Sequence, residues 1–203
     1  MENLILKSIS VENFASFAEP ITFTTEADLS KKEHLENTFP LDDLRFNKVS
    51  FLYGANGSGK TFFCKILREI QRLLLVSPLT TTDAAQLLSI PQLKEMDLPV
   101  KTFAFDTSFQ SKPTKFAIEL ILDGTTYHYA FSVSGKEIVY ELLTKKYRRT
   151  EKLLERTSPS FKDITVRSEL KGFDSAKHTV KEEALCLPIA AMLNTPLASK
   201  LVS

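Results

Sequence analysis

The chain has little of several residue types that would mark a special class of protein. Its 203 residues include two cysteines, no tryptophan and six glycines. Two cysteines are too few for a disulfide scaffold, and Cys64 is expected to be a small buried thiol rather than a reactive one. The formal net charge of +1 argues against a strongly basic nucleic-acid module, although it leaves room for a local patch.

Long apolar runs are also missing, and no segment has the length of a membrane span. The first residues, Met1-Glu-Asn-Leu-Ile-Leu-Lys7, lack the basic stretch and apolar core of a signal peptide. We therefore expect a cytoplasmic protein with no membrane partner. With 43% apolar and 25% charged residues, the chain can build one or two compact domains.

Half of the glycines lie in one short motif. Gly54-Ala-Asn-Gly-Ser-Gly-Lys-Thr61 matches the phosphate-binding pattern G-x-x-x-x-G-K-[ST] at every fixed position. Such glycines let successive backbone N–H groups turn toward one point. We predict that Lys60 reaches the β and γ phosphates of ATP and that the Thr61 hydroxyl ligates Mg²⁺. The candidate nucleotide-binding residues are Gly54, Ala55, Asn56, Gly57, Ser58, Gly59, Lys60 and Thr61.

The flanks of this loop favour a strand before it and a helix after it. Residues 48–53, Lys-Val-Ser-Phe-Leu-Tyr, form an apolar run typical of a buried strand. Apolar residues then recur at helical spacing, and Pro78 is expected to end that helix. The helical set is Phe63, Ile66, Leu67, Ile70 and Leu74. The helix N-terminus would direct its N–H groups and dipole at the phosphates; a plain glycine turn before an ordinary helix is the alternative.

Period-two alternation predicts strands elsewhere. Residues 4–13 and 21–25 are predicted strands, and residues 26–47 a loop or short helix. From residue 115 to 133 apolar residues alternate on both sides of Asp123-Gly124, a hairpin turn signal. Further strands at 138–143 and 152–156 complete an antiparallel meander.

Helices are predicted in two further parts of the chain. Residues 77–100 contain several prolines and are expected to form broken helical pieces, with Ala84, Leu87 and Leu88 on one face. Residues 182–193 have a helical pattern despite Pro188, and residues 197–202 can continue it. Between residues 158 and 179 the chain is polar.

The order of these motifs resembles the ATP-binding-cassette-type heads of the structural-maintenance-of-chromosomes, RecF and overcoming-lysogenization-defect ATPases. Those heads begin with a strand and an Asn-Phe-x-Ser-Phe turn, here within Val11-Glu-Asn-Phe-Ala-Ser-Phe17. A second strand and a linker then lead to the glycine loop, in which Asn56 is typical of the group. Ala15 stands where the family turn often has arginine, which puts in doubt a base or phosphate contact from this turn.

A closer resemblance is to bacterial abortive-infection and anti-phage AAA-type ATPases of this group. Their N-terminal lobe carries a meander like residues 116–131, then a strand like Ile138-Val-Tyr-Glu-Leu-Leu143 and an ending like Leu154-Glu155-Arg156. The resemblance implies an α/β fold: a P-loop NTPase with an ABC-ATPase-like N-terminal lobe, made of a mixed sheet plus the antiparallel β-meander. It also implies ATP and Mg²⁺ as cofactors, a homodimer or higher oligomer, and an effector such as a nuclease or toxin.

The expected organisation is a single nucleotide-binding lobe over residues 1–203. It divides into strands, loop and helix (1–76), an irregular or helical insert (77–112), the meander (113–157) and a polar segment with a C-terminal helix (158–203). A Ser-Gly-Gly-type signature and an Asp-Glu ending that would hold Mg²⁺ and activate water are not found. The nearest mimic, Leu120-Ile-Leu-Asp123, is better explained as the hairpin tip. We therefore expect the C-terminal half of the head to lie outside this chain.

No catalytic residue can be identified from the sequence. Phosphoryl transfer needs a group that orients water, so little turnover is expected from this chain alone. Gln71, Gln86, Gln92 and Gln110 are equal candidates for the glutamine that senses the γ phosphate in such heads.

One basic cluster is a candidate nucleic-acid contact, with Tyr140 and Tyr147 available for stacking. It consists of Lys145, Lys146, Arg148, Arg149, Lys152 and Arg156. A solvated strand edge is the alternative explanation of these charges. The sequence as a whole predicts an ATP-binding switch in anti-phage defence or DNA-linked processing. A non-catalytic interaction module and a small-molecule P-loop kinase are the other candidates.

Overall fold

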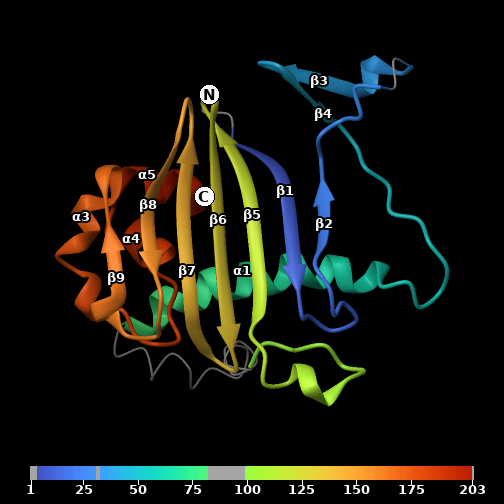
Figure 1. Cartoon of the computed structure of the whole chain (residues 1–203). Coiled ribbons are helices and arrows are strands. Elements are labelled where there is room, and N and C mark those ends of the chain that lie inside the picture. Colours follow the sequence, from blue (N-terminus) through green and yellow to red (C-terminus); the bar gives the residue numbers. More distant parts are fainter. Residues whose placement is uncertain (1–3, 31–32, 82–98, 203) are drawn as a thin grey trace.

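The computed structural model describes residues 4–30, 33–81 and 99–202, and its main element is a seven-stranded sheet (Figure 1). The sheet has the order β2-β1-β5-β6-β7-β8-β9, and each neighbouring pair of strands is antiparallel. Its strands are β1 (Leu4–Glu12), β2 (Ile21–Thr24), β5 (Thr114–Leu122), β6 (Thr125–Ser134), β7 (Glu137–Lys146), β8 (Thr150–Arg156) and β9 (Ile164–Val166).

The meander is confirmed, since β5 to β8 coincide with the alternating segments of the sequence. Asp123 and Gly124 connect β5 to β6 with φ angles of 48° and 75°. Positive φ at both central residues is the requirement of a tight hairpin turn whose twist matches the strands. The segment Leu120-Ile-Leu-Asp123 is therefore a strand end and a hairpin tip, as predicted.

The two N-terminal strands are also confirmed, but the expected mixed sheet is not found in the described residues. β1 lies between β2 and β5, so the N-terminal strands and the meander form one antiparallel sheet. Residues 48–53, directly before the glycine motif, belong to no strand. A mixed sheet would need this run to pair in parallel, and the described residues offer it no partner strand.

Helix α1 (Lys60–Thr81) crosses one face of the sheet (Figure 1). Ile66, Ile70 and Leu73 are buried at spacings of four and three residues, which places one apolar stripe against the sheet. Cys64 lies off this stripe and is exposed, so the expectation of a buried thiol was wrong. The expected end at Pro78 was wrong by three residues, because a proline in the last turn removes one hydrogen bond without stopping the helix.

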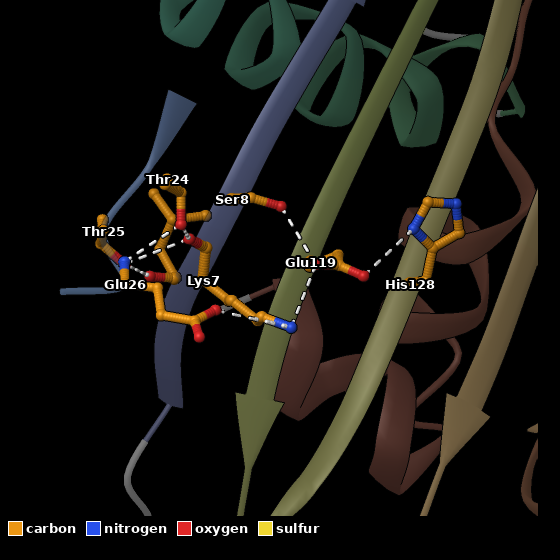
Figure 2. Close-up of polar contacts among 8 residues, drawn as sticks. Lys7, Ser8, Thr24, Thr25, Glu26, Glu119 and His128 are labelled. Atoms are coloured by element: carbon orange, nitrogen blue, oxygen red, sulfur yellow. Dashed lines mark hydrogen bonds and ion pairs between the residues drawn. The ribbon is translucent and has the colours of Figure 1, made fainter. Parts of the chain in front are cut away.

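The opposite face of the sheet is polar and is not covered by α1. Glu119 on β5 lies at the centre of a group of polar contacts on this face (Figure 2). Its carboxylate accepts a hydrogen bond from the Ser8 hydroxyl at 3.2 Å and lies 3.5 Å from the ammonium of Lys7 and 4.0 Å from Nδ1 of His128. One dry and one solvated face explain why apolar and polar residues alternate along these strands.

The C-terminal part packs behind β8 and β9. It contains α3 (Lys171–Asp174), α4 (Cys186–Met192) and α5 (Pro196–Val202), and α4 contacts both α5 and α1. The helix predicted over residues 182–193 is confirmed only from Cys186 to Met192, and a separate helix, α5, covers the predicted continuation at 197–202. Pro188 lies in the first turn of α4, where a proline is tolerated. Strand β9 and helix α3 were not predicted, because the segment that holds them is polar and the two elements are too short to show a periodic pattern.

Residues 26–47 hold a hairpin rather than the predicted loop or short helix, apart from a single 3₁₀ turn at Leu35–Asn37. β3 (Thr38–Leu41) pairs with β4 (Leu44–Asn47) as a separate two-stranded sheet. The hairpin was not predicted because Pro40 and Asp42-Asp43 are turn-forming residues. Pro40 is tolerated in a two-stranded ribbon, and Asp42 forms the turn with a φ angle of 50°. The predicted helical face of Ala84, Leu87 and Leu88 lies outside the described residues.

Candidate functional site

The glycine motif forms an exposed loop that ends at the first residue of α1. Gly57 and Gly59 have φ angles of 83° and 91°, which residues with a Cβ rarely adopt. The amides of Phe62 and Phe63 donate to the carbonyl of Gly59 at 2.9 and 3.1 Å, so the helix begins directly at the loop. The glycines thus turn the backbone sharply into a helix N-terminus, the arrangement that concentrates N–H donors for an anion.

Lys60 folds back over the loop. Its ammonium donates to the carbonyls of Gly54 and Ala55, both at 2.6 Å, and lies 3.4 Å from the hydroxyl of Ser58. A Cβ on Gly54 would lie 2.6 Å from that same hydroxyl, so the loop closes tightly on itself here. The side chain of Lys60 therefore places its positive charge at the start of the loop, beside Gly54 and Ala55. Asn56 and Thr61 are exposed beside it.

The turn between β1 and β2 packs against the loop, although some forty residues separate them in the sequence. A Cβ on Gly59 would lie 2.9 Å from Cζ of Phe17 and 3.3 Å from Oγ of Ser16. A hollow of about 190 Å³ lies between the two segments. It is lined on one side by Phe17 and Ile21, and on the other by loop residues and by Phe63 of α1.

The apolar run before the loop is exposed, and this overturns the predicted buried strand. The exposed fractions are 66% for Val49, 75% for Phe51, 49% for Leu52 and 84% for Tyr53. The rings of Phe51 and Tyr53 contact each other at a centroid distance of 6.2 Å. The pattern is that of a buried strand, yet the described residues cover it only in part: Leu52 and Tyr53 line the hollow beside Phe17, while most of the run is exposed.

The structure places only two of the four candidate glutamines. Gln71 is exposed on α1 and Gln110 is exposed after the 3₁₀ turn Thr107–Phe109, whereas Gln86 and Gln92 lie outside the described residues. Within residues 4–30, 33–81 and 99–202, no group of three or more His, Cys, Asp and Glu side chains could hold a metal ion.

A second hollow, of about 450 Å³, lies on the polar face of the sheet, where its lining includes Ser10, Ala117, Ala130 and Tyr140. No residue of the glycine loop lines it. We therefore do not place the nucleotide in this hollow, although it is larger than the one beside the glycine loop.

The basic cluster is divided by burial and ion pairs. Arg156 is fully buried, so its inclusion in a nucleic-acid contact was wrong, and Lys152 lies 2.7 Å from Glu155. Lys145 lies 3.3 Å from Glu151 and 2.6 Å from Glu169, so its charge is compensated. Lys146, Arg148 and Arg149, in contrast, have no ion pair among the residues that the structure describes. They surround Tyr147, which is 71% exposed and has the guanidinium of Arg148 at 5.8 Å from its ring centroid. Tyr140 instead lies at the second hollow.

Sequence reasoning missed the role of the residues that hold the turn beside the loop. Asn13 and Ala15 have φ angles of 54° and 52°, and both are buried. Asparagine tolerates this left-handed conformation, so Asn13 was a readable signal of a sharp turn. The proximity of Ser16 and Phe17 to the loop had no signal in the sequence, since it depends on the tertiary fold.

A glycine loop with two left-handed glycines, an inward-folded lysine and a long helix starting at that lysine defines a P-loop nucleotide-binding domain. A family model described as "AAA domain, putative AbiEii toxin, Type IV TA system" matches residues 49–184, which is more than half of the chain. The chain therefore belongs to this family of P-loop AAA-type domains, which implies ATP binding and a relation to abortive-infection proteins.

Comparisons with curated proteins and with solved structures give no match. Among the described residues, no helix is both long and apolar enough to cross a membrane.

Proposed function

We propose that this chain is the ATP-binding lobe of an ABC/SMC-like ATPase that works as a nucleotide-driven switch in bacterial anti-phage defence or DNA-linked processing. The observation that carries the proposal is the exposed glycine loop with Lys60 folded over it at the start of α1. Residues 54–60 would hold the phosphates, and Thr61 would ligate Mg²⁺. The bound metal would neutralise phosphate charge.

The position of the β1–β2 turn supports the ABC/SMC-like part of the proposal. The Asn-Phe-x-Ser-Phe turn and the glycine loop, the two motifs on which the resemblance depends, lie against each other at Phe17 and Gly59. The antiparallel meander continues the sheet from β1, so one structural unit carries both motifs and the meander.

The exposed apolar run supports completion of the lobe by a further segment. Phe51 and Tyr53 are large apolar side chains at 75% and 84% exposure, directly before the loop. Burying them would remove apolar area from water at about 25 cal/mol per Å². We infer that further strands of the complete head cover this run, and that two heads enclose ATP in a homodimer or higher oligomer that controls an effector nuclease or toxin.

Hydrolysis would require the further strands of the complete head. Phosphoryl transfer needs a residue that orients the attacking water, besides the phosphate loop and the metal. The sequence identifies no residue for this role, and among the described residues no group of three or more His, Cys, Asp and Glu side chains could hold a metal ion. We expect binding with little turnover from this chain alone; a steady ATPase rate that disappears in Lys60→Ala would contradict this.

Calorimetric titration of adenosine 5′-(γ-thio)triphosphate with Mg²⁺ tests the proposal. The wild type should bind, and Lys60→Ala should not. Lys65→Ala is the matched control, because Lys65 is on the same helix with its ammonium over the ring of Phe62 at 4.6 Å, not over the loop. Binding that is absent in the wild type, or unchanged in Lys60→Ala, would favour the non-catalytic interaction module. Phosphate transfer to a small acceptor by the single chain would favour the kinase.

The hairpin between β7 and β8 is a second proposed contact, with nucleic acid. Lys146, Arg148 and Arg149 are exposed and lack ion pairs within the described residues, while the ring of Tyr147 is exposed among them. Cations bind the phosphate backbone and an exposed aromatic ring stacks on an unpaired base. Lys145 contributes less than predicted, because two carboxylates already hold it.

A further inference from the structure

The turn between β1 and β2 is held rigidly at the edge of the glycine loop. The side chain of Asn13, 2% exposed, accepts from the amide of Phe103 at 2.9 Å and donates to the carbonyls of Phe109 and Lys112 at 3.0 and 2.9 Å. The backbone of Ala15 bonds on both sides, donating to Thr102 and accepting from Ala104 at 3.2 and 2.8 Å. These bonds fix the position of the next residue, Ser16.

Ser16 is half-buried at this edge, and its hydroxyl oxygen is buried without a hydrogen-bond partner. Its Oγ is the single buried side-chain polar atom without a partner within residues 4–30, 33–81 and 99–202. It lies 3.3 Å from the position that a Cβ of Gly59 would occupy, so it faces the loop at the residue before Lys60. A buried hydroxyl with no partner destabilises a fold, and such groups in native proteins call for an explanation.

We propose that the Ser16 hydroxyl is an additional nucleotide-binding group, which donates a hydrogen bond to an oxygen of the phosphate chain when ATP occupies the loop. The inference rests on the proposed function of the loop. Ser16 faces the loop at Gly59, where the backbone turns into α1. Its Oγ is closed off in the nucleotide-free chain, so the loop must shift at Gly59 for a charged phosphate oxygen to reach this donor. The hydroxyl that is unsatisfied in the nucleotide-free chain would then be satisfied in the complex, so binding would relieve a cost present in the free protein.

The variant Ser16→Ala separates this role from a structural one, because the two predict opposite effects on the free protein. Removal of an unsatisfied buried hydroxyl should raise the melting temperature of the nucleotide-free chain by about 2–4 °C. The same change should weaken binding of adenosine 5′-(γ-thio)triphosphate with Mg²⁺ about ten-fold or more, the usual effect of losing a hydrogen bond to a charged group. Ser16→Cys, similar in size but a weak donor, should also lose affinity.

Ser8→Ala is the matched control. Ser8 lies on β1 and also has a hydroxyl, but that hydroxyl donates to Glu119 on the face of the sheet that α1 does not cover (Figure 2). Its removal should leave nucleotide affinity unchanged and should not raise the melting temperature.

The outcomes distinguish this inference from the proposed function. Wild-type binding that depends on Lys60, with equal affinity in Ser16→Ala, would overturn the role of Ser16 alone. A lower melting temperature together with weaker binding in Ser16→Ala would show that the hydroxyl supports the turn instead of contacting the ligand. Absence of binding by the wild type would overturn both proposals.

Discussion

Glu141 and Arg156 are paired positions on β7 and β8, and both side chains are fully buried. Each reaches the same C-terminal segment from a different side. The carboxylate of Glu141 accepts from the amides of Cys186 and Leu187 at 2.8 and 3.0 Å, at the N-terminus of α4. The guanidinium of Arg156 donates to the carbonyl of Ala184 at 2.7 Å. One strand pair therefore binds both the amide and the carbonyl groups of the backbone at the start of α4.

This pair should control the attachment of the C-terminal helices to the sheet. Glu141→Gln leaves an amide that cannot accept on both oxygens, while Glu141 also accepts from the Tyr129 hydroxyl at 2.8 Å. Breaking a buried, hydrogen-bonded charge costs about 3–5 kcal/mol, so we expect a melting temperature lower by about 6–12 °C or more. Glu155→Gln, which removes only a surface pair with Lys152, should cost less than about 1 kcal/mol. Equal effects of the two variants would contradict this assignment.

The two cysteines should react very differently with alkylating reagents. Cys64 is exposed on α1, whereas Cys186 is buried in the first turn of α4. Burial, and then the nearby Glu141 carboxylate, raises the pKa of the Cys186 thiol well above its ordinary value. Mass spectrometry after iodoacetamide treatment should find one modification on the native chain, at Cys64, and a second after denaturation. Native modification of Cys186 would show that α4 detaches readily.

The same thiol gives a pH dependence of stability. Because the pKa of Cys186 is higher in the folded chain than in the unfolded chain, its contribution is fully present below the ordinary thiol value of 9.0 and is lost as the pH rises. Burial raises the pKa of Tyr129 in the same direction. The melting temperature should therefore fall above about pH 9, and the fall should be smaller in Cys186→Ala than in Cys64→Ala.

How far the sequence predicts this fold depends on whether a segment is stabilised by its neighbours in sequence or by distant ones. The meander was predictable because alternation and the Asp123-Gly124 turn specify it locally. The run at 49–53 was assigned wrongly, because burial depends on a partner strand that a periodicity pattern cannot supply. At the candidate site, the glycine motif was readable, whereas the contact of Ser16 and Phe17 with Gly59 arises only from the path of β1 beside α1.

The contact between Phe17 and Gly59 gives a test of how closely the turn supports the loop. Gly59→Ala would place a Cβ 2.9 Å from the Phe17 ring at a φ of 91°, whereas Gly57→Ala, at a φ of 83°, would meet nothing within 4 Å. Both variants carry backbone strain of about 1–3 kcal/mol, and only Gly59→Ala adds a clash. We expect a larger drop in melting temperature for Gly59→Ala, and partial recovery when Phe17→Leu is combined with it. Equal losses without recovery would show that the contact is unimportant.

The hairpin between β7 and β8 makes the final prediction. Arg148→Glu/Arg149→Glu should abolish retention on duplex DNA at low salt, because the change reverses two exposed charges beside Tyr147. Each phosphate contact contributes about 0.9 to the slope of log affinity against log salt, so the two arginines should account for about 2 of the slope measured for the wild type. Tyr147→Ala should weaken binding to single-stranded DNA selectively, because stacking needs an unpaired base.

Lys162→Glu/Lys171→Glu is the control for that experiment. Both lysines are exposed and lie outside the hairpin, and the variant changes the net charge by the same amount. If the control loses DNA as completely as the hairpin variant, overall charge rather than the hairpin governs retention. If the hairpin variant alone loses it, the two arginines beside Tyr147 govern retention, and Lys145 contributes little because two carboxylates already neutralise its charge next to the turn.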